Sequence, residues 1–432
     1  MRLFGSSGIR SKFDLGLLDL GFKVGLAVGR DYKKIVVGAD TRTSGDALKY
    51  AVISGLLAAG AETADVGITP TPTLALAARD YAAGVMITAS HNPAEYNGIK
   101  LWNPDGSAFD AAQQRTIEEM VSAASPETAP WSSLGRNTVE RGAIERHIAR
   151  VLQDFPEGLN LRVALDCGGG AASLITPRLL EKLGCEVLPL NCRPTGFFPR
   201  NPEPFEASLG ELMKATVGAG AALGIAHDGD ADRMMAVDDR GRFISGDKML
   251  SILARSLKAR DVVTTVDASM LLAETGLRVR RTRVGDSFVS EELKRGGGDF
   301  GGEPSGAWIF PKISHCPDGI YAAARIVHIA GEQRLSDLVD SLPAFPLRRG
   351  NIESNGLDRD ELEARLMALR PRAVEKMDGL RLNFEDGWLL VRSSGTEPKV
   401  RLTVEARTEA RVEELFRSAS EAVRECFGGR PA

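Results

Sequence analysis

The sequence predicts an α/β fold with buried parallel strands, followed by a smaller α+β unit at the C-terminal end. Three stretches share one pattern, a short β-branched run, then an aspartate, then small or polar residues: KIVVGADTR (34–42), LRVALDCGGG (161–170) and DVVTTVDAS (261–269). Each is followed by an amphipathic, helix-like stretch, and strands that alternate with helices indicate a parallel sheet.

The first of these helix-like stretches, DALKYAVISGLLAAG (46–60), has apolar residues at intervals of three and four and closes on Gly60. The strand-end aspartates at positions 40, 166 and 267 form a weak internal repeat that suggests three similarly built domains. Coincidence is the alternative, because strand-end aspartates are common in α/β folds. After residue 350 the chain changes to a helix-like stretch, two strand runs (GWLLVR and KVRLTVEA) and a final amphipathic helix, which indicates α+β.

Length and composition bound the class of protein. A chain of 432 residues exceeds the roughly 250 to 300 residues at which a single core stops growing, so two to four domains are expected. The net charge of -4 argues against a nucleic-acid partner. Five cysteines without a CxxC pair predict neither a disulfide framework nor a zinc site, and a cytoplasmic location is expected. The start lacks a signal-peptide pattern and no run of about 18 apolar residues occurs, so no membrane association is predicted.

The stretch GVMITASHNPAEYNGIK (84–100) begins as a buried strand and becomes polar at Ser90. The polar residues fall at the carboxyl end of the strand, where open α/β sheets place their ligands. Pro93 prevents the strand from continuing. A strand-to-helix connection capped by a serine or asparagine is the structural alternative, and the absence of GxSxG argues against a hydrolase nucleophile.

A second constellation is LGIAHDGDADRMMAVDD, in which Asp228, Asp230 and Asp232 alternate between two apolar runs. Alternate side chains of an extended chain point the same way, so the three carboxylates are expected to converge on one hard cation. A solvated acidic turn is the alternative. An EF-hand calcium loop does not fit, because its sixth position, a glycine in that motif, is Arg233 here.

Charge links these two stretches. Two carboxylates 4 Å apart repel each other by roughly 4 kcal/mol at an effective dielectric constant near 20, so the cluster favours a divalent ion. Mg²⁺ prefers few carboxylates and completes its shell with phosphate oxygens. A phosphorylated Ser90, carrying about -1.5 to -2 charges, would supply such oxygens.

Three further loops carry polar groups suited to bind an anion or neighbouring hydroxyls. GWLLVRSSGTEPKVRL offers the Arg392 guanidinium beside hydroxyls and backbone N–H groups at a turn, a phosphate cradle, with a plain β-hairpin as the alternative. GGEPSGAWIF places Glu303 and Ser305 on a glycine-rich loop that could contact vicinal hydroxyls, with a tight turn as the alternative. FGSSGIR offers Ser6, Ser7 and Arg10 as anion ligands, which is a weak signal by itself.

In this order, TASHNP, DGDADR, GEPSG and RSSGTEP resemble the motifs of the α-D-phosphohexomutase family, and the resemblance covers essentially the whole chain. It implies three related α/β domains and a smaller C-terminal α+β domain around a central cleft. The expected domains are residues 1–148 with the phosphoserine loop, 149–243 with the metal-binding loop, 244–346 with the sugar-binding loop and 347–432 with the phosphate-binding loop.

The resemblance also implies roles for individual residues. Ser90 would be the phosphoserine, and the catalytic set would be Ser90, His91, Lys100, Arg10 and Arg233. One Mg²⁺ would be held by Asp228, Asp230, Asp232 and the Ser90 phosphate. The sugar phosphate would be bound by Glu303, Ser305, Arg392, Ser394, Gly395 and Thr396. Lys100 and His91 are alternative proton acceptors.

The implied reaction has three steps: Ser90 gives its phosphoryl group to the sugar monophosphate, the resulting hexose 1,6-bisphosphate turns around, and its other phosphate returns to Ser90. The bisphosphate would serve as intermediate and activator. GEPSGAW, with HCPDG after it, is most similar to archaeal phosphoglucosamine mutases, so glucosamine 6-phosphate and glucosamine 1-phosphate are the expected pair. The partner would be this small molecule, and the resemblance leaves a homodimer open.

Other functions stay open on the sequence alone. Within the family, the alternative is a phosphoglucomutase or phosphomannomutase of broad specificity. The non-catalytic alternative is a sugar-phosphate-binding protein that has kept the fold. A phosphatase that uses the same metal site would release phosphate into solution instead of onto the sugar.

Overall fold

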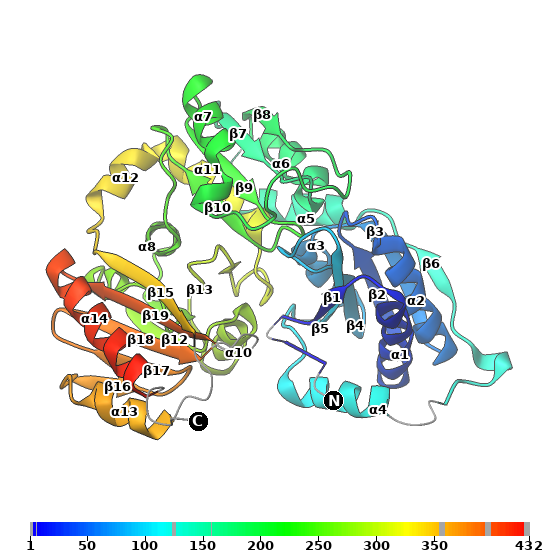
Figure 1. Cartoon of the computed structure of the whole chain (residues 1–432). Helices are drawn as coiled ribbons and strands as arrows, with labels where there is room; N and C mark the ends of the chain where they lie inside the picture. Colours follow the sequence, from blue (N-terminus) through cyan, green and yellow to red (C-terminus); the bar gives the residue numbers. More distant parts are fainter. Residues whose placement is uncertain are drawn as a thin grey trace. The chain divides into compact units, whose positions relative to one another are not determined.

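The computed structural model describes residues 3–5, 7–122, 127–156, 158–353, 359–393 and 399–426. The chain divides into two compact units, Met1–Ala259 with Gly285–Ser341 and Arg260–Val284 with Leu342–Ala432. Strands and helices alternate along most of the chain (Figure 1), which confirms the α/β prediction. Among the described helices, none is long and apolar enough to cross a membrane.

The N-terminal part of the first unit contains a sheet with parallel inner strands. In sheet order its strands are β1 (Ile9–Lys12), β5 (Tyr96–Trp102), β4 (Ala83–Ile87), β2 (Lys34–Ala39), β3 (Glu62–Ile68) and β6 (Asn137–Val139). β2 pairs in parallel with β3 and β4, whereas β5 returns antiparallel to β4. Its helices are α1 (Leu15–Asp31), α2 (Gly45–Ala58), α3 (Thr71–Ala77) and α4 (Ala111–Ser122). The strand and helix predicted within 34–60 are therefore confirmed as β2 and α2.

Helices α1 and α2 lie side by side in close contact (Figure 1). Glycines make this approach possible, because a Cβ on Gly25 would lie 2.1 Å from the Val52 carbonyl oxygen and one on Gly55 would lie 2.0 Å from that of Phe22. Apolar side chains such as Val24 and Leu48 are fully buried in this core. The packing fixes the inner strands, so the loops at their carboxyl ends have defined positions.

A second sheet in the same unit carries the acidic loop. Its strands, in sheet order, are β10 (Met234–Val237), β9 (Leu223–His227), β7 (Arg162–Asp166) and β8 (Glu186–Leu190). β7 pairs in parallel with β8 and β9, and β10 is antiparallel to β9. Its helices are α5 (Ala143–Leu152), α6 (Thr176–Lys182) and α7 (Gly210–Gly218). The short connection between β9 and β10 therefore holds all three aspartates of the predicted metal loop.

The remaining elements of the first unit surround the predicted sugar loop. They are α8 (Gly246–Ser256), α10 (Asp286–Gly296), β13 (Phe300–Gly302), β14 (Trp308–Ile309), α11 (Gly319–Glu332) and α12 (Leu335–Ser341). β13 and β14 pair antiparallel, so the GEPSG loop is a hairpin connection. Asp318 caps α11, where its carboxylate accepts from the N–H groups of Ile320 and Tyr321.

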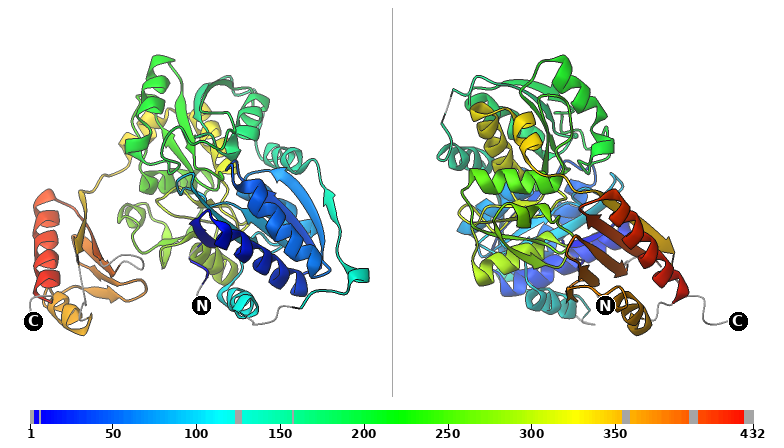
Figure 2. Two further views of the ribbon diagram at one scale, coloured as in Figure 1. Left: turned by 45° about the vertical axis from the view of Figure 1, so that its right-hand side comes forward. Right: turned by 90° about the vertical axis from the view of Figure 1, so that its left-hand side faces the viewer.

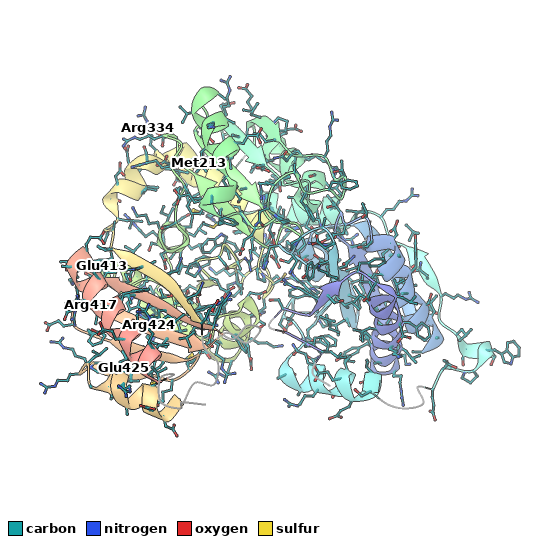
Figure 3. All side chains as sticks on the ribbon, in the orientation of Figure 1. Met213, Arg334, Glu413, Arg417, Arg424 and Glu425 are labelled. Atoms are coloured by element: carbon teal, nitrogen blue, oxygen red, sulfur yellow. The ribbon has the colours of Figure 1, made fainter. Side chains whose placement is uncertain are left out.

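The second unit contains an antiparallel sheet covered by a helix. In sheet order its strands are β15 (Leu347–Glu353), β19 (Lys399–Ala406), β18 (Gly387–Ser393), β17 (Leu380–Asn383) and β16 (Ala373–Glu375). The unit also contains β11 (Asp261–Thr265), α9 (Leu271–Glu274), β12 (Arg278–Thr282), α13 (Arg359–Met367) and α14 (Glu409–Glu425). Figure 2 shows α14 along one face of the sheet, and α14 carries the exposed Glu413, Arg417 and Arg424 (Figure 3). This arrangement agrees with the α+β prediction for the end of the chain.

Candidate active site

Ser90 lies on the loop between β4 and β5 in an unusual backbone conformation. Its φ is 50°, in the left-handed region that residues other than glycine rarely adopt, and it is buried. Its N–H donates to the Thr88 hydroxyl oxygen at 2.8 Å. Such strained positions persist only where the surroundings determine them, and they cluster at functional sites. Ser90 therefore lies beyond the end of β4 at Ile87, and its role as a nucleophile stays a prediction.

A buried arginine holds this loop in place. The Arg42 guanidinium donates to the carbonyl oxygens of Ser90 at 2.8 Å and Asn92 at 2.7 Å, and to two further carbonyls, one in the same loop and one at the start of β5. Asp40 orients this guanidinium through a contact of 3.1 Å and also accepts from the Thr88 hydroxyl at 2.6 Å. The strand-end aspartate that the sequence marked as a repeat element therefore supports the serine loop indirectly.

The acidic loop turns sharply between β9 and β10. One oxygen from each of Asp228, Asp230 and Asp232 lies within 4.8 Å of the others, and all three residues are buried. The sequence predicted convergence from an extended chain, but the loop is a turn with Ala231 at a φ of 60°. The turn, and not strand alternation, brings the carboxylates together.

Contacts from the first sheet join the acidic loop to the serine loop. The Ser90 hydroxyl donates to Asp228 at 2.9 Å. The Lys100 ammonium donates to Asp230 at 2.7 Å and to Asp232 at 2.6 Å. The Thr71 hydroxyl also donates to Asp230, at 2.5 Å. The structure therefore assembles Ser90, Lys100 and the acidic triad in one buried cluster.

The electrostatics of the cluster follow from burial and crowding. Burial, followed by repulsion from Asp232 and Asp230, raises the pKa of Asp228. Burial would lower the pKa of Lys100, but attraction to Asp230 and Asp232 outweighs it and raises that pKa. Burial, with the positive charges of Arg233, Arg10 and Lys100, lowers the pKa of His91 to about 2. His91 is therefore neutral, and Lys100 is an ammonium ion.

The residues of the acidic loop fit a small divalent cation. Besides the convergent carboxylates, the buried Oδ1 of Asp230 has no hydrogen-bond partner among the residues that the structure describes. An unpartnered buried carboxylate oxygen is costly, and a bound cation would satisfy it. Hard oxygen donors of this kind suit Mg²⁺.

The remaining predicted residues of the first unit surround this cluster. Arg10 donates to the side-chain oxygen of Asn92 at 3.0 Å. Nδ1 of His91 lies 3.3 Å from the Ser90 hydroxyl oxygen. The Arg233 N–H donates to Asp228 at 3.1 Å, and its guanidinium pairs with Glu203 at 2.7 Å. The three side chains therefore contact the serine and acidic loops or lie next to them.

The predicted sugar loop lies against the acidic loop. The Met234 N–H donates to the Gly306 carbonyl oxygen at 3.0 Å, so the GEPSG hairpin continues the edge of β10. Glu303 is buried and accepts from the Gly285 N–H at 2.7 Å, while the Ser305 hydroxyl lies 3.4 Å from the Glu303 carboxylate. The loop that carries Glu303 and Ser305 is thus joined to the strand that follows the acidic loop, and its contact with sugar hydroxyls stays a prediction.

The predicted phosphate loop belongs to the second unit. Arg392 is the penultimate residue of β18, its guanidinium pairs with Asp378 at 2.8 Å, and its Nε is buried without a partner among the described residues. Ser394, Gly395 and Thr396 lie outside the described residues. A hollow of ≈ 330 Å³ adjoins Arg392, and two more guanidinium groups, those of Arg349 and Arg401, line it.

Sequence reasoning missed several residues that support the site. Arg42 and Thr71 act through contacts with loops more than 45 positions away, which no local pattern shows. Asp286, at the start of α10, accepts from the Ser7 hydroxyl at 2.5 Å and contributes charge near Lys100 and Asp232. The one available signal was the Asp-Thr-Arg sequence after β2, in which the strand-end Asp40 precedes Arg42.

Comparison with known proteins identifies the family. Sequence models of the phosphoglucomutase/phosphomannomutase family match residues 1–128 (α/β/α domain I), 145–241 (domain II), 245–345 (domain III) and 357–422 (the C-terminal domain). The chain belongs to this family, whose members are phosphohexomutases of the isomerase class, and it is such an enzyme.

Its relatives include proteins matched over nearly their whole length. A protein of Methanococcoides burtonii, named a probable phosphoglucosamine mutase, is 48% identical over 99% of this chain and 100% of its own. A phosphoglucosamine mutase of Methanococcus maripaludis is 38% identical over 100% of both chains. A solved phosphoglucomutase/phosphomannomutase family protein of Burkholderia thailandensis has a TM-score of 0.88 and 28% identity, covering 100% of this chain and 98% of its own.

Proposed function

We propose that this enzyme interconverts glucosamine 6-phosphate and glucosamine 1-phosphate through a phosphoserine at Ser90. One observation carries the proposal. A buried serine, held in a left-handed conformation, donates to one carboxylate of a convergent acidic triad at 2.9 Å. Such a serine has no evident structural use, whereas phosphoryl transfer needs an oxygen fixed beside cation ligands.

Each residue of the cluster has a role in this reaction. In the first half, the bond between phosphorus and Ser90 Oγ breaks, and a bond from phosphorus to a sugar hydroxyl oxygen forms. In the second half, Ser90 Oγ attacks the other phosphate of the bisphosphate, and the sugar oxygen leaves. Arg10, Arg233 and Lys100 supply positive charge near the transferring oxygens.

The proton of the attacking sugar hydroxyl needs an acceptor. Lys100 is bound as an ammonium ion to two carboxylates, so it holds a proton that it would first have to lose. Nδ1 of His91 lies 3.3 Å from Ser90 Oγ and belongs to a neutral ring. A ring whose pKa is lowered to about 2 is, however, a weak base, so Lys100 and His91 remain alternative acceptors.

Mg²⁺ would be held by Asp228, Asp230 and Asp232 with an oxygen of the Ser90 phosphate. When bound, it would stabilise negative charge on the transferring phosphoryl group and offset the repulsion among the carboxylates. The buried Oδ1 of Asp230, which has no hydrogen-bond partner within the described ranges, supports this assignment.

The phosphate that does not react needs a separate site, and the hollow of the second unit suits it. Arg349, Arg392 and Arg401 line the hollow together with the polar Asn351 and Thr403. The side chains of Arg349 and Arg401 make no hydrogen bond or ion pair with another described residue, so their two charges, which outnumber the one Asp267 carboxylate of the lining, are available to an anion. Guanidinium groups bind phosphate by paired hydrogen bonds. This extends the predicted cradle of Arg392, Ser394, Gly395 and Thr396, and Glu303 with Ser305 would contact the sugar hydroxyls.

The glucosamine substrate rests on the relatives' names and on GEPSGAW. The test is a side-by-side assay of glucosamine, glucose and mannose 6-phosphates with Mg²⁺ and a trace of hexose 1,6-bisphosphate. We expect the highest kcat/KM for glucosamine 6-phosphate. If glucosamine turns over slowest, the enzyme is the broad phosphoglucomutase or phosphomannomutase instead. Binding without turnover would indicate a sugar-phosphate-binding protein, and free phosphate as the product would indicate a phosphatase.

The Ser90→Ala variant tests the nucleophile in the same assay. We expect turnover to fall by at least about 10³-fold, since the covalent step has no substitute. The matched control is Ser54→Ala, a serine on the exposed side of α2, which should keep wild-type activity. Full turnover by Ser90→Ala would refute the phosphoserine.

A further inference from the structure

Two cysteines lie side by side at the ends of neighbouring strands. Cys167 directly follows β7, and Cys192 lies two positions beyond β8, which pairs in parallel with β7. Their sulfur atoms are 3.3 Å apart. Cys167 is buried and Cys192 is partly exposed, while Cys185, Cys316 and Cys426 are buried elsewhere.

The surrounding backbone holds the pair in this position. The Cys192 thiol contacts the carbonyl oxygens of Leu190 at 3.2 Å and Leu165 at 3.4 Å, which lie on the two adjacent strands. The Cys167 N–H donates to the Leu190 carbonyl oxygen at 3.2 Å. Both cysteines are therefore anchored to the same parallel strand pair. A disulfide requires about 2.05 Å between sulfurs, so closure needs a movement of roughly 1 Å.

We propose that Cys167 and Cys192 are a redox-modifiable pair that a peroxide converts to an intramolecular disulfide. The Cys192 thiolate attacks one oxygen of hydrogen peroxide, forms a sulfenic acid and releases hydroxide, which takes up the thiol proton to give water. The Cys167 sulfur then attacks the Cys192 sulfur and displaces the hydroxyl group, which leaves as water with the Cys167 proton. In total, two thiols and one peroxide give one disulfide and two waters.

The two thiols differ in a way that suits these roles. Contact with Cys167 lowers the pKa of Cys192, the more exposed thiol and thus the first to meet an oxidant. Burial raises the pKa of Cys167, which matches a resolving thiol that reacts second. Cys185, by contrast, has its pKa raised to about 11 by burial and makes a suitable unreactive control.

The segment that would move supports the acidic loop. Residues 167–170 lead into Ala171, whose N–H donates to the Gly229 carbonyl oxygen at 2.9 Å. Gly170 packs so closely that a Cβ on it would lie 2.6 Å from the same oxygen. Arg200 adds a second link, since it pairs with Asp166 at 2.9 Å and donates to the His227 carbonyl oxygen at 2.7 Å. Disulfide closure is therefore expected to displace the loop that carries Asp228.

In the experiment, the reduced full-length chain is treated with hydrogen peroxide, its remaining thiols are blocked with N-ethylmaleimide, and the protein is digested with trypsin. We expect a cross-link between peptides 163–178 and 183–200, with a mass loss of about 2 Da that dithiothreitol reverses. Peptide 183–200 contains both Cys185 and Cys192, so the variants decide the assignment. The cross-link should persist in Cys185→Ser and disappear in Cys192→Ser. Because Cys192 is partly exposed, we expect Cys192→Ser to fold even if Cys167→Ser does not.

The functional readout is the Mg²⁺ concentration for half-maximal activity. We expect this concentration to rise about tenfold on oxidation, because the loss of residues that hold metal ligands in position weakens metal binding by at least this much. The Cys192→Ser variant should show no such rise. Absence of the cross-link in the wild type, or its persistence in Cys192→Ser, overturns the pairing. A cross-link with an unchanged Mg²⁺ requirement overturns the coupling to the acidic loop. The chemical readout does not depend on which sugar phosphate the enzyme uses.

Discussion

The hydroxyl of Ser90 donates to the Asp228 carboxylate at 2.9 Å, although 138 positions separate the two residues. Each residue follows a buried strand, Ser90 three positions after β4 and Asp228 directly after β9, and each loop contains one non-glycine residue in the left-handed conformation. The contact joins two separate sheets at the carboxyl ends of their strands, the position where α/β proteins bind ligands. The chemistry proposed here depends on this junction.

Removal of the metal should abolish turnover, and Mg²⁺ should restore it. Within the triad, Asp230→Asn removes the carboxylate whose Oδ1 has no partner, and we expect the Mg²⁺ requirement to rise about 100-fold or more. The control is Asp46→Asn, since this aspartate is exposed on α2 and pairs with Lys49, far from the triad in sequence. Each protein is treated exhaustively with EDTA, and its activity is then measured as Mg²⁺ is added back. The activity before the addition checks the metal requirement, and the Mg²⁺ concentration for half-maximal activity checks the variant. Undiminished turnover without a divalent ion would contradict the metal assignment.

Arg349→Gln should weaken sugar-phosphate binding by about 10- to 100-fold, because a hydrogen bond to a charged group is worth roughly 1.5 to 3 kcal/mol. The matched control is the adjacent Arg348→Gln. Arg348 lies on the opposite face of β15, where it stacks 4.0 Å over the Phe416 ring and pairs with Glu413 of α14. KM for the sugar monophosphate should rise in the first variant only. Equal effects of the two substitutions would show that the hollow is not the phosphate site.

Gly229→Ala should disable the site without unfolding the protein. A Cβ at this position would lie 2.6 Å from the Ser90 carbonyl oxygen, so the acidic loop would have to move away from the serine loop. We expect kcat to fall by about 10²-fold, as for misplacements near 1 Å. Gly218→Ala is the control, because a Cβ there meets no atom within 4 Å and alanine favours the helix α7. Comparable kcat values for the two variants would contradict the proposed role of this close approach.

Arg42→Gln should lower the free energy of unfolding by about 3 to 5 kcal/mol, since it leaves Asp40 buried and unpaired. It also removes the donor to the Ser90 and Asn92 carbonyl oxygens, so activity should fall as well. The control Arg240→Gln breaks only exposed ion pairs to Asp337 and Asp340, worth at most about 1 kcal/mol. Urea unfolding of both variants measures the difference. A midpoint for Arg42→Gln equal to that of Arg240→Gln would show that the buried pair is dispensable.

Much of the fold and the core of the site could be predicted from sequence, since their signals are local. The β-branched runs before Asp40 and Asp166 predicted buried strands, and the clustered aspartates predicted a cation site. The shape of the acidic loop could not be predicted, because Ala231 adopts its left-handed conformation only in the folded context. Arg42 escaped detection for a related reason, since its partners lie about 50 positions along the chain.

The most direct test of the account is the phosphorylation state of Ser90 itself. The purified enzyme is incubated with hexose 1,6-bisphosphate and Mg²⁺, and its intact mass is measured before and after excess glucosamine 6-phosphate is added. We expect a species about 80 Da heavier, whose phosphate fragmentation places on Ser90; this species should be absent from Ser90→Ala and depleted by the sugar monophosphate. Active enzyme that never carries this phosphate, or that carries it on another residue, would contradict the central claim.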